Sequence, residues 1–477
     1  MQNKLPWRFW TGYAFRNSVV AARMNLADKF ARVSALKPNR PTTARAPSVR
    51  APQPEDALSR LLGAAIATNK YGEHVLVRNW YSTPEFSEPF PGTLDLLSHV
   101  RDNADCKRAA ALSQPEKWLF LDTETTGIAG GTGTYAFLIG LAWWDAGGLQ
   151  VEQFIMRDFA EEHSILQELA ARIAERPVLV TFNGKTFDWP LLENRFTMTR
   201  AIRLPALAAH LDLLHPARAL WKFRLGTVRL VDLEREVLDP VRLGWSRKDD
   251  VPTSLIPQFY FEYLRGGPPG PLASVVRHNQ MDLRGLAALF GRINLLLSEK
   301  GHLDSETQGL DLFGLSRFLR RRGEPARAHF ACSQALSLGL PPDLRPQARS
   351  DLAMLAKRRG EHEKAAELWH ALAADESAGL QACIQLAMYY ERHAKQLDTA
   401  LEFGRLALAK VHRLRGISRD PAMERRHARV EQTILHRVSR LEHRMRLGRG
   451  SPTLPIAPHE AGTRAVSKRW ACSVSAD

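Results

Sequence analysis

The sequence contains few cysteines and no long hydrophobic run. Only four cysteines occur among 477 residues, and no two of them form a C-x-x-C pair. This argues against a disulfide framework and a cysteine-based zinc site, and it favours a reducing, cytoplasmic setting. No stretch approaches the roughly 20 uncharged apolar residues that a membrane span requires. We therefore expect no association with a membrane.

Acidic residues are scarce at both ends of the chain. Residues 1–53 contain ten Lys/Arg and one acid, and residues 410–477 contain fifteen Lys/Arg and six acids, whereas the middle of the chain is slightly acidic. A basic protein suggests an anionic partner, most commonly nucleic acid, either DNA or RNA. Because the excess lies in the terminal segments, a second interpretation stays open, in which the basic ends only keep the chain soluble.

Composition predicts disorder at both ends. Residues 1–53 are rich in Arg, Pro and Ala and lack sustained periodicity, and residues 448–477 are also predicted to be disordered. An organellar transit peptide has a similar composition, but we favour Met24 as the true start of translation. Residues 54–114 are predicted to form a small mixed accessory region, with a helix over 56–67 and a strand over 74–81.

Residues 115–300 show the most regular pattern. Apolar strands are expected at 117–121, 135–144, 149–156, 178–182 and 210–214, and helices at 161–175, 187–198 and 275–297. The first three strands look antiparallel, and helices and strands alternate after them. This order predicts an α/β domain with a mixed sheet and helices on both faces.

Residues 305–447 are predicted to be all-helical. Gly323 and Gly360 are 37 positions apart, each is preceded by a basic run, and a degenerate third copy begins at Tyr390. The repeat places glycine at a turn and small alanines where helices cross, namely Ala326, Ala328, Ala365, Ala366 and Ala400. This period resembles tetratricopeptide helical hairpins, which would present substrate or bind a protein partner. A generic helical bundle is the alternative.

The motif Asp122-Thr123-Glu124 follows an apolar run and carries the chemistry. Side chains alternate along a strand, so Asp122 and Glu124 point to the same face. Two carboxylates side by side at the end of a buried strand repel each other unless a cation lies between them. Mg²⁺ or Mn²⁺ is the simplest solution, because both prefer carboxylate oxygens. A surface turn with solvated acids is the alternative, and the preceding apolar run argues against it.

Two later motifs supply further acids. Asp188 ends the segment 182–188, which follows an apolar strand and contains the Asn183-Gly184 turn. His278 and Asp282 are four residues apart on the long helix, so they share one helix face. Each motif is weak alone, but their order after a strand that bears Asp-x-Glu makes them specific together.

Residues 117–297 resemble the DEDD exonuclease superfamily, and most closely its YprB-like ribonuclease-H-like branch. The segments 121–127, 182–188 and 278–282 match the three exonuclease motifs, and 130–135 and 249–252 also look like this branch. The resemblance implies a ribonuclease-H-like fold, hydrolysis of nucleic acid from the 3′ end, and two Mg²⁺ or Mn²⁺ ions held by Asp122, Glu124, Asp188 and Asp282.

The third motif departs from the superfamily pattern. The superfamily usually has Tyr four residues before the final Asp, or His five before it, whereas His278 lies four before Asp282. His278 is the candidate general base, because its unperturbed pKa lies near 6.5. The alternative is that His278 only orients a metal ligand.

Several residues receive secondary predictions. We expect Thr125, Asn183 and Lys185 to contact the phosphate or sugar of the substrate, and Asp212 either to support the site or to cap a turn. The Gly-rich segment 129–133 lacks the residues of a nucleotide-binding loop. The leading interpretation is an active 3′–5′ exonuclease. The alternatives are an inactive ribonuclease-H-like scaffold and an enzyme that cuts internally.

Overall fold

The computed structural model describes residues 57–86, 88–89, 92–98, 112–127, 133–298, 307–375, 378–417 and 420–449. The disorder predicted for 1–53 and for residues after Arg449, the alternative start at Met24, and most of the Gly-rich segment 129–133 lie outside these ranges. Within them, no helix is both long enough and apolar enough to span a membrane.

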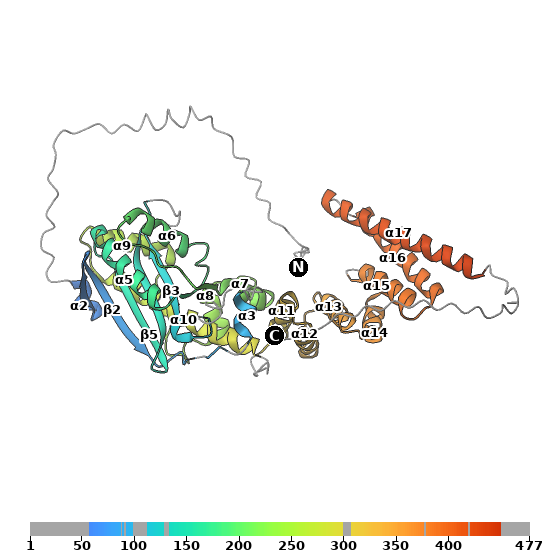
Figure 1. Cartoon of the computed structure of the whole chain (residues 1–477), viewed down its shortest axis with the longest axis horizontal. Helices are drawn as coiled ribbons and strands as arrows, with labels where there is room; N and C mark the ends of the chain where they lie inside the picture. Colours follow the sequence, from blue (N-terminus) through green and yellow to red (C-terminus); the bar gives the residue numbers. More distant parts are fainter. Residues whose placement is uncertain are drawn as a thin grey trace, which may run out of the picture. The chain divides into compact units, whose positions relative to one another are not determined.

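A mixed sheet of seven strands lies at the centre of the described α/β part (Figure 1). The strand order is β1-β2-β5-β4-β3-β6-β7. The pairs from β1 to β3 are antiparallel, and β3, β6 and β7 run parallel. The predicted mixed α/β sheet is therefore confirmed. The strands are β1 (Ala65–Asn69), β2 (Gly72–Tyr81), β3 (Trp118–Thr125), β4 (Ala136–Asp145), β5 (Gly148–Ile155), β6 (Val178–Thr181) and β7 (Ala209–Asp212).

Helices cover both faces of the sheet. The α-helices are α2 (Ala57–Leu62), α3 (Thr93–Ser98), α5 (Glu162–Glu175), α6 (Asp188–Thr199), α7 (Leu214–Leu225), α8 (Leu230–Leu233), α9 (Ile256–Leu264) and α10 (Gly270–Leu297). Short turns of other helix types are η1 (Pro115–Lys117), η2 (Phe159–Glu161), η3 (Glu234–Leu238, a π-helix) and η4 (Thr253–Leu255).

The alternation of β3 decides which helices meet the acidic motif. Trp118 and Phe120 belong to the hydrophobic cluster that contains α7 and most of α10, and the Trp118 ring meets Phe290 of α10 edge to face at 4.7 Å. Leu119 and Leu121 instead pack in the cluster that contains α5 and α6. Asp122 and Glu124 continue the series of Trp118 and Phe120 and therefore face α10.

The accessory region predicted at 54–114 is not separate from the sheet. Its strand β2 pairs with β5, so β1 and β2 extend the same sheet. The helix predicted over 56–67 is wrong in its second half, because α2 ends at Leu62 and β1 begins at Ala65. Gly63 makes the change of direction with φ 61°, and antiparallel pairing with β2 then satisfies the backbone groups that a longer helix would have used.

The C-terminal part of the described chain is all-helical, as predicted. Successive hairpins are formed by α11 and α12, α13 and α14, and α15 and α16, and α17 follows them. Gly323 and Gly360 occupy the first two hairpin turns with φ of 88° and 83°, and Lys395 occupies the third with φ 57°. The helices are α11 (Gly309–Arg322), α12 (Pro325–Leu338), α13 (Arg345–Arg358), α14 (His362–Leu372), α15 (Gly379–Arg392), α16 (Leu397–Ile417) and α17 (Pro421–Arg449).

Small residues allow these helices to approach closely. Ala328, Ala365, Ala366 and Ala400 are buried as predicted, but Ala326 is exposed because it lies on the outer side of α12. The first hairpin packs on α7 of the α/β part. A Cβ atom at Gly314 of α11 would lie only 2.2 Å from the Leu220 carbonyl oxygen, so glycine is required at this contact.

Candidate active site

Strand β3 and helix α6 bring the first three acids together. Asp122 pairs in register with Gly140 of β4, and Glu124 lies two residues further along the same side of β3. Thr123 points to the opposite side, where its hydroxyl donates a hydrogen bond of 2.5 Å to Asp188 Oδ1. Asp188 is the first residue of α6, so this hydrogen bond fixes the start of α6 beside the acidic strand.

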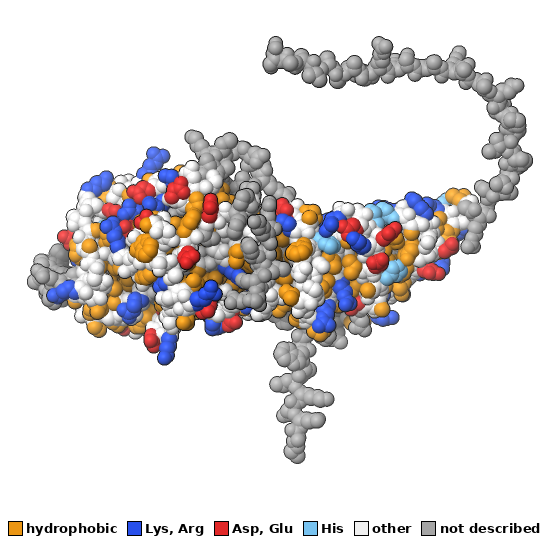
Figure 2. Space-filling view, turned by 90° about the horizontal axis from the view of Figure 1, so that it is seen from below, with side chains coloured by type: hydrophobic (Ala, Val, Ile, Leu, Met, Phe, Trp, Pro, Cys, Tyr) orange, Lys and Arg blue, Asp and Glu red, His pale blue; other side chains and the backbone are white. Residues whose placement is uncertain are grey.

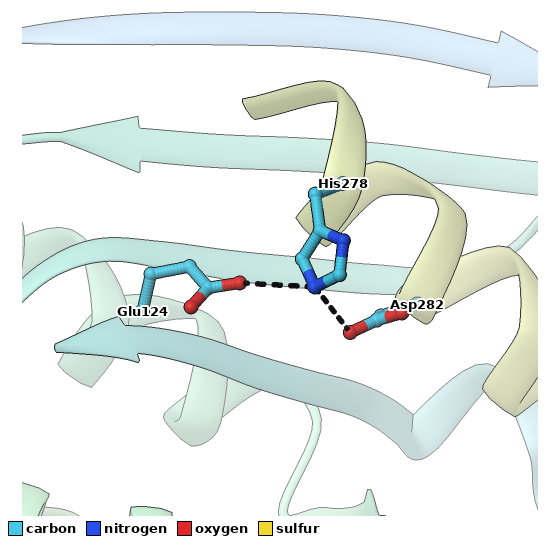
Figure 3. A group of neighbouring side chains, drawn as sticks. All are labelled: Glu124, His278 and Asp282. Carbon is cyan, nitrogen blue, oxygen red and sulfur yellow. Dashed lines mark ion pairs between the residues drawn. The ribbon is translucent and has the colours of Figure 1, made fainter. Parts of the chain in front are cut away.

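Helix α10 supplies the fourth acid and the histidine. His278 Nε2 lies 3.8 Å from Glu124 Oε1 and 3.5 Å from Asp282 Oδ2 (Figure 3). One ligand atom from each of these three residues lies within 4.8 Å of the other two. The predicted helix face therefore does place His278 and Asp282 opposite the acids of β3.

A buried amide network holds Asp122. Asn279 Nδ2 donates to Asp122 Oδ2 at 2.8 Å, and Asn279 Oδ1 accepts from Gln153 Nε2 at 2.8 Å. A Cβ atom at Gly140 would lie 2.1 Å from Asn279 Oδ1, so a larger residue there would displace Asn279. The sequence does not predict these roles of Gln153, Asn279 and Gly140. The available signal was a glycine inside the otherwise apolar run of β4.

The electrostatics of the cluster favour a cation. Burial, followed by the negative charges of Asp282, Glu124 and Asp188, raises the pKa of Asp122 well above its ordinary value, although the Asn279 hydrogen bond opposes this. Burial and the charges of Asp282, Asp188 and Asp250 likewise raise the pKa of Glu124. Burial also raises the pKa of Asp188, against the hydrogen bond from Thr123. Carboxylates that destabilise one another in this way fit a divalent metal site.

A second charged network supports His278 and Asp282. His278 Nδ1 lies 2.7 Å from Asp250 Oδ1. A carboxylate oxygen can only accept, so Nδ1 carries the hydrogen of this bond, and Nε2 faces Glu124 and Asp282. Arg247 donates to Asp250 at 2.8 Å, to both oxygens of the buried Glu234, and to Asp282 Oδ1. This leaves Asp282 Oδ2 directed toward the cluster.

Arg247 and Glu234 were not predicted as site residues. Asp250 was noticed only as part of a motif, without a role. Burial raises the pKa of Asp250, but the hydrogen bonds and charges of Arg247 and His278 together lower it below its ordinary value. Asp250 is therefore a negatively charged partner for the imidazole.

Asp212 organises the loop that bears Asn183 and Lys185. Its Oδ1 accepts from the backbone N–H of Asn183 at 2.8 Å and of Leu214 at 3.0 Å, and its Oδ2 accepts from the Lys185 N–H at 3.2 Å. Asp212 thus both caps the turn into α7 and braces this loop. The Thr125 hydroxyl donates to the Gly127 carbonyl at 3.0 Å. Contacts of Thr125, Asn183 and Lys185 with substrate stay predictions.

His210 beside this loop gives a prediction for stability against pH. Burial and then the charge of Lys185 lower the pKa of His210 to about 4, although Asp212 opposes them. Because the pKa of His210 is lower in the folded state, its neutral imidazole contributes fully to the free energy of unfolding above the unfolded-state pKa of about 6.5. This contribution is lost as the pH falls toward 4. Lowering the pH from 7 to 4.5 reduces the free energy of unfolding of the parent protein. The reduction in His210→Gln should be smaller by about 2 to 3 kcal/mol.

Urea unfolding at the two pH values measures this difference. His215 is exposed on α7, and His215→Gln is the matched control, which should follow the parent protein. An unchanged pH dependence in His210→Gln would show that His210 is protonated equally in both states.

Comparisons with known proteins agree with this architecture. The RNase H superfamily profile matches residues 119–294, which contain all four acids. The chain is 31% identical over 294 residues to the uncharacterized protein YprB of Bacillus subtilis (strain 168), covering 61% of this chain and 68% of YprB. The chain therefore belongs to the YprB-like family of ribonuclease-H-like proteins, as predicted, and carries a nuclease-type scaffold.

Among solved structures, the chain is similar to the family B DNA polymerase from the hyperthermophilic archaeon Pyrobaculum calidifontis. The TM-score is 0.30 and the sequence identity 15%. The match covers 43% of this chain and 29% of the polymerase, so the chain spans less than a third of that protein.

Proposed function

We propose that the protein is a metal-dependent 3′–5′ exonuclease that hydrolyses phosphodiester bonds of DNA or RNA. The observation that carries the proposal is the group formed by Glu124 of β3 with His278 and Asp282 of α10, whose ligand atoms lie within 4.8 Å of one another. Asp122 and Asp188 lie close enough to this group for the acids to raise one another's pKa. This donor set suits two Mg²⁺ or Mn²⁺ ions. When bound, such ions would lower the pKa of a water molecule and stabilise the departing 3′ oxygen.

The residues of the chain have separable roles in this proposal. The four carboxylates would hold the cations. His278 accepts a proton at Nε2 from the attacking water, because its Nδ1 is already committed to Asp250 at 2.7 Å. Arg247 fixes Asp282 through Oδ1. Thr125, Asn183 and Lys185 contact the phosphate or sugar of the strand.

The polarity of cleavage tests this proposal. Linear DNA and RNA oligonucleotides of matched sequence, labelled at the 5′ end, are incubated with Mn²⁺ beside a circular single strand. The expected result is a ladder that shortens from the 3′ end, with the circle intact. Nicking of the circle would indicate an internal cut instead, and the absence of cleavage in both linear substrates would indicate an inactive scaffold.

Asp250→Asn tests the role of His278 as the base. The variant keeps a side chain of the same shape but removes the negative charge that stabilises the imidazole when it accepts a proton. We expect kcat to fall about tenfold to a hundredfold, with little change in KM. Asp249 is the exposed neighbour, so Asp249→Asn is the matched control and should retain full activity. Equal activity of both variants would assign His278 only an orienting role.

A further inference from the structure

Helix α17 carries three distinct stripes of side chains. Its apolar stripe packs with residues of α15 and α16 in one hydrophobic cluster, and comprises Val430, Ile434, Val438, Leu441 and Met445. This side of the helix is therefore taken up by the helical hairpins. The remaining circumference carries most of the charge.

The acidic stripe of α17 is neutralised by α16. Glu424 lies 3.7 Å from Arg415, Glu431 pairs with both Arg415 and His412, and Glu442 lies 2.8 Å from Arg405. At about 100° per residue, these three glutamates lie in one narrow row along the helix. All three acids of α17 therefore face α16.

The third stripe is made of arginines, which outnumber their acidic partners among the described residues. Six arginines fall within about a third of the helix circumference and along about 28 Å of its length, namely Arg425, Arg426, Arg429, Arg437, Arg440 and Arg444. We call this surface the arginine face. Glu391 of α15 is shared by the last three of them. Among the described residues, Arg425, Arg426 and Arg429 have no acidic partner, and all three are exposed.

The arginine face suits a phosphate backbone better than a lipid surface. A helix that inserts into a membrane needs exposed apolar side chains beside its basic ones, but the apolar stripe of α17 is packed against α15 and α16. The exposed apolar side chains of α17 are scattered singly, at Met423, Leu435 and Leu447, and none of them lies in the arginine face between Arg425 and Arg444. Guanidinium groups bind phosphate in a bidentate manner. On the face in Figure 2, by contrast, basic and acidic side chains of the α/β part are interspersed.

We propose that the arginine face of α17 binds the sugar-phosphate backbone of the nucleic acid on which the protein acts, independently of base sequence. The inference rests on the proposed nuclease function, because it assigns the same substrate a second contact surface. The contact would be electrostatic and strongly dependent on salt.

The test measures binding without cleavage. The full-length protein is titrated in EDTA against fluorescent single-stranded DNA and RNA, at salt concentrations from about 50 to 200 mM. Arg425, Arg426 and Arg429 are changed together to Gln. We expect binding to weaken at least about tenfold, and the slope of log K against log salt to decrease by about two to three. The matched control changes the exposed Arg321, Arg349 and Arg358 to Gln and should alter binding less than about twofold.

Two further readouts separate this inference from the proposed function. Cleavage with Mn²⁺ by the triple variant at saturating substrate should keep the parent kcat, with a raised KM. Loss of binding in EDTA together with no cleavage by any form would support the arginine face and refute the exonuclease. Normal cleavage with unchanged binding in the triple variant would overturn the arginine face. Unchanged nucleic acid binding with lost binding to phosphatidylserine vesicles would also overturn it, in favour of a membrane.

Discussion

Asp122→Asn is expected to lower metal-dependent hydrolysis at least about a thousandfold. Burial and the other three acids raise the pKa of Asp122, which is a proposed metal ligand. The variant keeps the hydrogen-bonding shape toward Asn279 but removes one charge. Initial rates on a labelled oligonucleotide with Mn²⁺ measure the loss. Asp145→Asn removes an exposed acid at the end of β4 and should retain full activity.

The same variant should stabilise the protein when no divalent ion is present. A carboxyl group whose pKa is raised in the folded state stabilises the protein below its unfolded-state pKa. This stabilisation is lost as the pH rises through the folded-state pKa. At neutral pH the ion-free cluster is therefore destabilising, and Asn removes part of the repulsion. We expect Asp122→Asn to raise Tm in EDTA by roughly 2 to 5 °C and to lose most of the stabilisation by Mn²⁺. A lower Tm in EDTA would contradict this electrostatic account.

Arg247→Met is expected to lower the free energy of unfolding by about 3 to 5 kcal/mol. Glu234 is 1% exposed and receives two hydrogen bonds from Arg247, at 2.6 and 2.7 Å. Among the residues that the structure describes, removing the guanidinium leaves this buried carboxylate with one longer hydrogen bond, from Trp245 Nε1 at 3.2 Å. Urea denaturation of the parent and the variant measures the change.

Two control variants make the Arg247 result specific. Arg235 forms an exposed ion pair with Glu236 at 2.8 Å, and Arg235→Met should cost less than about 1 kcal/mol. The double variant Arg247→Met/Glu234→Gln also removes the unpaired negative charge of Glu234. It should therefore recover much of the lost free energy of unfolding. If the double variant is no more stable than Arg247→Met, the loss comes from packing and not from an unpaired carboxylate.

The parts of the fold that sequence predicted well are those with strong local periodicity. The apolar strands around the acidic motif and the long helix α10 were expected close to their observed bounds, although α10 begins earlier, at Gly270. The helix predicted over 56–67 includes the first residues of β1, whose structure depends instead on pairing with β2. The helices α8 and α9 follow irregular segments and were not predicted.

The site residues also divide into those that local sequence patterns predict and those that depend on contacts between elements. The acids and His278 were predicted because alternation along a strand and spacing along a helix are local rules. Gly140, Gln153 and Asn279 act through a contact among β4, β5 and α10. Arg247 acts through acids on η3 and α10. Such roles depend on how elements pack together, and neither composition nor spacing specifies that.

The central claim is that Asp122, Glu124, Asp188 and Asp282 together hold two divalent ions. The most direct measurement is a crystal structure of the full-length protein soaked in Mn²⁺, with the ions located from manganese anomalous scattering. We predict two peaks about 4 Å apart among these four carboxylates. The absence of any peak among these four carboxylates, in crystals where Mn²⁺ reaches the site, would contradict the account.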